Sequence, residues 1–511
     1  MDVVVVGGGH NALVAATYLA RAGLAVEILE AADHVGGAAV SEAPFAGVDV
    51  RLSRYAYLVS LMPAALIADL GLDVSLADRS VASCTPYDGD AGPAALLVTD
   101  DLPGTRASFR ELTGSDAEHD AWTHFYEDAQ RLADAVAPTL LGPLPAERQI
   151  RAAVPDGVWH DLITRPLGEA LERRFSSDLV RGVVATDALI GTFASLRETS
   201  LVQNRCFLYH VIGGPWRVPV GGMGAVSAEL RRVAVEAGVR ISLSHRVTAL
   251  EPGADHVTVR GSGPDGGAFG REAGWVLSGV APALLAELCG DVVPTRPVGA
   301  QLKVNMVLSR LPRLRSGADP AVAFAGTLHS GEAYSDLERV HRAVAAGAPV
   351  GSLTGPPPGE VYCHTLTDRS ILSPELDAAG VQTLTYFGLH VRADDPTPRA
   401  DLLAAAVAGL ETHLAEPLEP LLLTDADGRP CLEAKVPRDI EAELGMPGGH
   451  IFHGDLDWPW LSEPAAGPAA AWGVATDYPR VLVCGSGAVR GGAVSGIAGH
   501  NAAHALLELL T

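Results

Sequence analysis

The N-terminal segment combines an apolar run, a glycine-rich turn and a carboxylate at a spacing that could bind phosphates. Val3–Val6 precedes a G-x-G-x-x-A pattern at Gly7, Gly9 and Ala12, and Glu30 follows a second apolar run. Gly7 permits a tight turn out of a strand, and Gly9, which lacks a Cβ atom, lets a pyrophosphate approach the backbone. Ala12 is small enough for a helix to pack on that strand. This arrangement predicts a dinucleotide site.

The elements that must position these residues are a strand, a helix and a second strand. Residues 13–22 are amphipathic and predict a helix that starts near Asn11, whose free N–H groups would face the phosphates. Residues 24–29 predict the second strand, and the Glu30 carboxylate at its end can accept hydrogen bonds from ribose hydroxyls. A carboxylate there favours FAD or NAD over NADP. The alternative is a glycine-rich turn in an ordinary strand–helix–strand unit.

A second glycine pair, Gly36 and Gly37, lies just past the acid and resembles the FAD-binding loop of glutathione-reductase-type flavoproteins. Residues 7–39 as a whole resemble the phytoene desaturase and amine oxidase superfamily. Within it they are similar to a phytoene-dehydrogenase-like branch described as pyridine-nucleotide-disulfide oxidoreductase domain proteins. The resemblance implies an FAD cofactor. It implies cofactor contacts at Gly7, Gly9, His10, Asn11, Ala12, Glu30, Ala31, Gly36, Gly37, Ala38 and Ala39.

The C-terminal segment repeats the strand, glycine loop and helix pattern over residues 481–510, which is another helix start suited to anions. In the resembling family this element closes over the flavin, which implies contacts at Gly485, Gly487, Gly492 and Val494. Arg490 stands where the family often has a proline. We expect this cation, and His500, near the flavin loop. The Arg490 guanidinium could balance a reduced flavin, bond a phosphate or cap a carbonyl.

A third segment of the same resemblance precedes a predicted helix over residues 226–237. Its glycines, Gly221, Gly222 and Gly224, are not a second dinucleotide motif, because Pro215 and Pro219 interrupt any strand leading into them. The resemblance implies that the backbone at Val247 contacts the adenine.

Candidates for the redox site follow the second glycine pair. The resemblance places residues 51–57 close to the flavin ring, so Arg54, Tyr55 and Tyr57 are candidate catalytic residues. Trp216 is a candidate wall over the flavin. Since large aromatic side chains commonly fill cores, each of these could instead be a rim or core residue.

The sequence offers little for a metal or a redox dithiol. His450, His453 and Asp455 have a tempting spacing but no further ligand at a convincing spacing, so we expect a hydrogen-bonded or flavin-adjacent turn and no metal. The six cysteines form no C-x-x-C pair, which argues against a catalytic dithiol and a cysteine zinc site. Scattered single cysteines fit a reducing cytoplasm.

Composition limits the classes of binding partner that we expect. The formal net charge is −24, so nucleic acid is not an expected partner. No apolar run reaches the roughly 18 residues of a membrane span. We expect a cytoplasmic protein with a small-molecule substrate and no transmembrane segment. Peripheral membrane contact is not expected, and the oligomeric state is open.

The chain of 511 residues suits two interleaved domains. We predict an α/β protein with a glutathione-reductase-type Rossmann domain made of residues 1–75, 218–292 and 440–511. A mixed α+β substrate domain would comprise residues 76–217 and 293–439. Its first part should be largely helical, with helices over 117–132 and 167–188.

These observations together predict an FAD-dependent oxidoreductase, a dehydrogenase, desaturase or oxidase. Hydride would pass from a C–C or C–N bond of a small, largely apolar substrate to flavin N5. Oxygen or a quinone-like acceptor would reoxidise the flavin. The alternatives are an amine oxidase, a redox-neutral isomerase or reductase that uses reduced flavin, and a non-catalytic flavin-bound scaffold.

Overall fold

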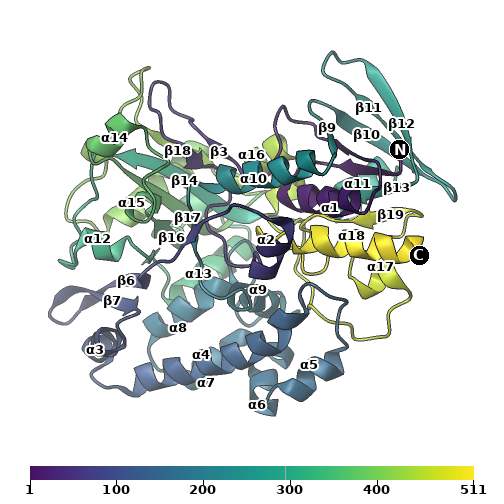
Figure 1. Cartoon of the computed structure of the whole chain (residues 1–511). Coiled ribbons are helices and arrows are strands. Elements are labelled where there is room, and N and C mark those ends of the chain that lie inside the picture. Colours follow the sequence, from purple (N-terminus) through teal and green to yellow (C-terminus); the bar gives the residue numbers. More distant parts are fainter. Residues whose placement is uncertain (294) are drawn as a thin grey trace.

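The computed structural model describes residues 1–293 and 295–511 (Figure 1). Its N-terminal strand lies in the middle of a five-stranded sheet in which every neighbouring pair is parallel. The order is β19 (Val481–Val483), β13 (Trp275–Ser278), β1 (Val3–Val6), β2 (Val26–Leu29) and β9 (Arg240–Ser242). Because each strand belongs to one of the three segments expected to bind the cofactor, the chain enters this sheet at three separate places.

The valines of β1 alternate between two hydrophobic cores, since successive strand residues face opposite sides of a sheet. Val3 and Val5 pack in a core with residues of three helices, whereas Val4 and Val6 pack against a three-stranded antiparallel sheet. The helices are α1 (His10–Arg21), α10 (Met223–Glu236) and α18 (Ile497–Leu510), and the sheet comprises β10 (Arg246–Pro252), β11 (Val257–Ser262) and β12 (Ala268–Ala273). A strand covered on both faces is an uninterrupted apolar run, which explains the four consecutive valines.

A second, seven-stranded sheet is mixed, with only the β15–β6 pair parallel. Its order is β18 (Leu432–Lys435), β14 (Ala300–Leu308), β17 (Gln382–Arg392), β16 (Gly359–Tyr362), β15 (Thr327–Ser330), β6 (Val81–Gly89) and β7 (Gly92–Thr99). All nine residues of β14 are buried. Leu302 and Val304 pack in the apolar core of this region, while Gln301 and Lys303 line a cavity on the other side.

A group of helices fills the lower part of the molecule in Figure 1 and packs around a third core. They are α3 (Leu102–Thr113), α4 (Ala117–Val136), α5 (Glu147–Ala153), α6 (Asp156–Trp159), α7 (Leu167–Arg174), α8 (Asp178–Ala185) and α9 (Val202–Val211). The single helix expected over residues 167–188 is wrong. The chain breaks between α7 and α8, where Ser177 caps α8 by accepting a hydrogen bond from the Val180 backbone N–H.

The remaining elements connect or flank these layers. They are α2 (Ala64–Leu70), α11 (Pro282–Leu288), α12 (Pro320–Ala323), α13 (Tyr334–Ala345), α14 (Pro374–Ala378), α15 (Arg399–Glu411), α16 (Pro437–Leu444), α17 (Pro468–Ala471), β3 (Ser41–Glu42), β4 (Leu52–Ser53), β5 (Leu76–Ala77) and β8 (Val218–Pro219). The predicted fold class is confirmed: a parallel-sheet Rossmann-like region lies beside a mixed-sheet region. The exact domain boundaries stay a prediction. Within the described residues, every helix is too short or too polar to span a lipid bilayer.

Candidate functional site

A large cavity of about 1300 Å³ connects the two sheets. At one end it is lined by the glycine turn after β1 and by the C-terminal loop before α18. At the other end it is lined by strands β14, β15 and β16 of the mixed sheet and by helices α4 and α8. One continuous space therefore reaches from the predicted cofactor residues into the predicted substrate domain.

The first part of this cavity is a cradle made by Gly7, Gly8 and Gly9 together with Gly36 and Gly37. Gly7 has a φ of 87°, a conformation that glycine adopts without strain. The backbone N–H of Gly36 donates to the Gly8 carbonyl at 2.9 Å, which ties the two glycine segments together. A Cβ atom built on Gly9 would meet no protein atom within 4 Å. The space beside Gly9 is thus open to a ligand.

The Glu30 carboxylate is fixed at the edge of this cradle by two backbone donors. The N–H groups of Gly8 and Ala32 donate to its two oxygens at 2.6 Å and 2.7 Å. Each oxygen keeps a free lone pair, so the group can still accept hydrogen bonds from hydroxyls. The geometry suits the ribose contact expected from the sequence.

Buried polar atoms of the cradle also lack protein partners. His10 Nε2, both amide atoms of Asn11 and His453 Nδ1 make no hydrogen bond to any described residue, although each residue lines the cavity. Burial lowers the pKa of His10 to about 4 and that of His453 to about 3, so both rings are neutral. Since buried polar atoms are normally hydrogen-bonded, these atoms mark a place for a polar ligand.

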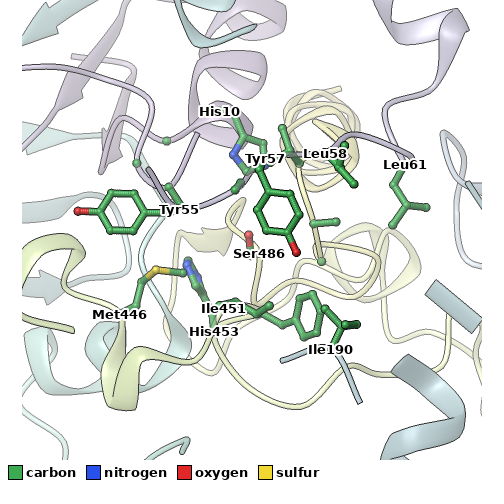
Figure 2. A pocket seen from close by; sticks show the side chains of 18 of the residues that line it. His10, Tyr55, Tyr57, Leu58, Leu61, Ile190, Met446, Ile451, His453 and Ser486 are labelled. Carbon is green, nitrogen blue, oxygen red and sulfur yellow. The ribbon is translucent and has the colours of Figure 1, made fainter. Parts of the chain in front are cut away.

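The candidate catalytic residues all line the cavity, but they are held differently. The Arg54 guanidinium pairs with the carboxylates of Glu42 and Glu433, and the Tyr55 hydroxyl donates to Glu443. Figure 2 shows the Tyr57 ring projecting into the pocket, whereas the Tyr55 ring points to one side. Tyr57 is therefore the member of this segment that presents its ring to a ligand.

Tyr57 has two neighbours from the mixed sheet. Its ring centroid lies 4.8 Å from that of Tyr362, and the Lys303 ammonium nitrogen lies 4.8 Å from the Tyr57 centroid. Lys303 Nζ donates to the carbonyl oxygens of Ser53 at 2.5 Å and Tyr55 at 2.6 Å. Burial lowers the pKa of Lys303 well below its ordinary value. These contacts tie the predicted redox segment to strand β14.

Comparison with known proteins identifies the relatives of this chain. A model of the NAD(P)-binding Rossmann-like domain matches residues 5–76. Over 526 aligned residues the chain is 47% identical to an uncharacterized protein of Mycobacterium tuberculosis, covering 100% of this chain and 97% of that protein. The chain belongs to the same family as this protein.

More distant relatives extend the comparison. The rat pyridine nucleotide-disulfide oxidoreductase domain-containing protein 2 is 27% identical, over 98% of this chain and 92% of its own length. Cyclohexylamine oxidase from Brevibacterium oxydans shares the fold, with a TM-score of 0.57 at 15% identity over 100% of this chain and 99% of that one. The predicted relationship to oxidoreductases of the pyridine-nucleotide-disulfide class is confirmed.

Most of the predicted cofactor residues come together around the cavity. Those that line it are Gly7, Gly9, His10, Asn11, Ala12, Glu30, Ala31, Gly36, Gly37, Ala38, Val247, Gly485, Gly492 and Val494. Ala39 and Gly487 do not line it. Ala39 is fully buried and its carbonyl accepts a hydrogen bond from Ser227, while Gly487 lies so close to Pro282 that a Cβ atom would approach the proline Cδ to 2.3 Å. The predicted cofactor contacts of these two residues stay predictions, as do the others.

Arg490 is a structural clamp. Its side chain is buried away from the cavity lining, and its guanidinium donates to the carbonyl oxygens of Thr139 at 2.7 Å, Gly142 at 2.8 Å and Pro459 at 3.1 Å. Of the three roles considered from the sequence, carbonyl capping fits this geometry. His500 also lies outside the lining and stacks among other aromatic rings, at 4.2 Å from the His504 centroid.

Trp216 and the histidine turn occupy the periphery of the site. Trp216 lines the cavity and packs on His210 with centroids 4.9 Å apart. His453 lines the cavity, whereas His450 Nε2 lies 3.8 Å from an Asp455 carboxylate oxygen. The turn therefore has one histidine facing the cavity and one facing an acid.

Sequence reasoning missed the titratable residues on the wall of the cavity opposite the glycine cradle, which we call the far wall. Lys303, His329, Glu360 and Asp187 line the cavity, and they come from four separate elements. Lys303 gave the one available signal, because a lysine inside a buried, mostly apolar strand needs a partner. The others carried no recognisable spacing along the chain.

Proposed function

We propose that this protein is an FAD-dependent dehydrogenase that removes a hydride from a C–C or C–N bond of a small organic substrate. The single observation that carries the proposal is the continuous cavity, which joins the glycine cradle to a chamber walled by Tyr57, Tyr362 and Lys303. A cofactor held at one end would thus share an enclosed space with a substrate held at the other.

The residues of the cradle fit the adenine-linked half of FAD. The open space at Gly9 suits a pyrophosphate, Glu30 suits ribose hydroxyls, and the unpartnered atoms of His10 and Asn11 supply hydrogen bonds. Val247 would contact the adenine, and Gly492 and Val494 would contact the flavin. When bound, FAD supplies a hydride acceptor at N5, which no amino-acid side chain can provide.

The chamber residues position the substrate and take up its proton. The Tyr57 and Tyr362 rings form an apolar wall against which a flat or unsaturated substrate can pack. Burial favours the neutral amine of Lys303, whose two N–H bonds are directed at the Ser53 and Tyr55 carbonyls. The amine then keeps a lone pair, so Lys303 is our candidate for the base that accepts the substrate proton.

An amine oxidase is the second candidate, and a specific observation favours it. The tilted Tyr57–Tyr362 pair resembles the aromatic pair that frames the amine in many amine oxidases, and the nearby carboxylates of Asp187 and Glu360 would attract an ammonium group. In that case the hydride leaves the carbon next to nitrogen. The frame and the cofactor would be the same.

The test begins with the purified full-length protein. We expect yellow protein that releases one FAD per chain on denaturation, identified by chromatography. Anaerobic mixing with a panel of polyenes, cyclic alkenes, ketones and amines should bleach the flavin with one class, and air should restore the colour. Colourless protein that takes up no added FAD would contradict the proposal. Bleaching by amines alone, with hydrogen peroxide released in air, would select the second candidate.

A further inference from the structure

The far wall of the cavity holds a histidine and two glutamates whose potential ligand atoms converge. The donor atoms of His329, Glu332 and Glu360 all lie within 4.8 Å of one another, and His329 Nε2 is 3.9 Å from a Glu332 carboxylate oxygen. The three residues are 4%, 2% and 3% exposed. Such a group needs an explanation, because buried carboxylates normally have a cationic or hydrogen-bonding partner.

The fold brings these residues together through strand register. His329 on β15 lies directly opposite Glu360 on the antiparallel strand β16, so their side chains share one face of the sheet. Glu332 follows three residues after His329, beyond the turn at Gly331, where φ is 67°. Gly182 on α8 leaves room for this turn, since a Cβ atom there would come within 1.8 Å of the Glu332 carbonyl oxygen.

The negative charge of the cluster is opposed only in part, because the Arg79 charge acts on Glu360 from a distance and forms no ion pair with either glutamate. Neither carboxylate oxygen of Glu332 has a hydrogen-bond partner among the described residues. Among residues 1–293 and 295–511, no lysine or arginine nitrogen lies within 4.0 Å of a Glu332 or Glu360 carboxylate oxygen. The two Glu332 oxygens are therefore buried acceptors that a bound cation can engage.

The histidine is arranged as a ligand. Its Nδ1 lies 2.8 Å from the Thr85 hydroxyl, and burial lowers its pKa to about 3, so the ring is neutral. With Nδ1 engaged by Thr85, Nε2 points to the carboxylates. Glu360 is held in turn by the hydroxyl of Tyr362 and by that of Thr186 at 3.5 Å. Metal ligands are commonly oriented by such outer hydrogen bonds.

We propose that His329, Glu332 and Glu360 form a binding site for one divalent transition-metal ion, with zinc as the reference ion. Tetrahedral zinc binds its protein ligands at about 2.0–2.2 Å, which places two ligand atoms roughly 3.4 Å apart. The donor atoms, which lie within 4.8 Å of one another, therefore have to close by up to about 1.4 Å. One nitrogen and two carboxylates suit Zn²⁺ better than Mg²⁺, which prefers oxygen alone.

The three proposed ligands lie at different depths from the cavity. His329 and Glu360 line the cavity, whereas Glu332 lies behind them and outside the lining. A monatomic ion can reach all three donors, but an organic ammonium group in the cavity would have to pass the other two to reach Glu332. The ion's remaining positions would face the cavity, where water or a substrate oxygen or nitrogen could bind. This inference does not depend on the proposed redox reaction.

The test measures zinc uptake by the flavin-loaded protein after treatment with a chelator and its removal. Equilibrium dialysis against Zn²⁺, read by atomic spectrometry, should give one ion per chain for the wild type. E332Q and H329Q should each weaken zinc binding by at least about 10-fold. Mg²⁺ under the same conditions should bind at least 10-fold more weakly than Zn²⁺.

Matched controls separate this site from incidental binding. E375Q and H256Q change exposed residues of the same types and should leave uptake unchanged. An unchanged flavin spectrum and circular dichroism would show that E332Q and H329Q are folded. Equal zinc uptake by the wild type and E332Q overturns the proposal. A second result would also overturn the proposal: E332Q and H329Q bind zinc as the wild type does, but need a higher diamine concentration to bleach the flavin. In that case the cluster binds an ammonium group instead of a metal ion.

Discussion

The two ends of the cavity are built by different means. The cradle at Gly7–Gly9 and Gly36–Gly37 is made of backbone groups from one short stretch of chain. The far wall is made of side chains such as Lys303, His329 and Glu360, which come from strands far apart in sequence. A phosphate-bearing cofactor has a constant shape that backbone N–H groups can match, whereas a substrate is distinguished by side chains. The first end is therefore general to the superfamily, and the second should determine what this enzyme acts on.

The substitution Gly9→Ala should distinguish the two ends of the cavity most strongly, because it changes the cradle alone. The added methyl would meet no protein atom, and Gly9 has φ −67°, so the fold should tolerate alanine. The methyl would, however, occupy the space needed for close approach of the pyrophosphate. We expect at least a roughly 100-fold loss of FAD affinity, or about 2.7 kcal/mol, measured by titrating flavin into the apoprotein.

Gly267→Ala is the matched control, because it also adds a methyl where no protein atom lies within 4 Å, but in the loop between β11 and β12. It should bind FAD as the wild type does. If Gly9→Ala retains full FAD affinity, the cradle does not bind the pyrophosphate, and the comparison between the two ends fails.

The complementary change at the far end is Lys303→Met. The thioether keeps much of the volume but removes the amine that contacts the Ser53 and Tyr55 carbonyls. We expect FAD to remain bound and anaerobic flavin reduction by the best substrate to slow about 100-fold, which is the lower range for loss of a general base. The acidic limb of the rate–pH profile should disappear, because only the neutral amine accepts a proton.

Lys303→Arg keeps hydrogen-bond donors for the Ser53 and Tyr55 carbonyls but supplies no titratable base, and it serves as the second variant. If Lys303 acts only by holding the 53–57 segment, Arg should rescue the rate without a change in the shape of the pH profile. Retention of the acidic limb in Lys303→Met would show that another group is the base.

The contrast between the two ends of the cavity also explains which parts of the site could be predicted from the sequence. The cradle was predictable because its strand, glycines, helix and Glu30 are contiguous, and each has a local physical reason. The β15–β16 register that pairs His329 with Glu360 is a tertiary fact with no local signal. Arg490 was noticed but its role was left open, because only the fold brings the Thr139 and Pro459 carbonyls to it. The break before α8 was missed since apolar periodicity continues across it.

A substitution of Arg490 tests how far the loop before α18 is stabilised by its contacts with the helical region. Arg490→Met removes charged hydrogen bonds to the Thr139 and Gly142 carbonyls, which follow α4, and to the Pro459 carbonyl. We expect a loss of about 2–3 kcal/mol in the free energy of unfolding, measured by denaturant titration of the flavin-loaded protein. The flavin reduction potential should stay as in the wild type. A lowered potential would instead show that Arg490 acts on the reduced flavin.

The smallest expected effect is a pH dependence of stability from the far wall. Burial, followed by the charge of Glu360, raises the pKa of Asp187 from 3.8 to about 8. Between those values the folded protein binds a proton that the unfolded chain has released, so stability is greatest below pH 4 for this group and falls as pH rises towards 8. Asp187→Asn cannot titrate and should remove that part of the fall. We expect the drop in melting temperature between pH 5 and pH 8 to shrink by about 2–4 °C.

The exposed substitution Asp265→Asn should leave the drop unchanged. Parallel curves for the wild type and Asp187→Asn would show that Asp187 does not hold a proton in the folded protein over this pH range.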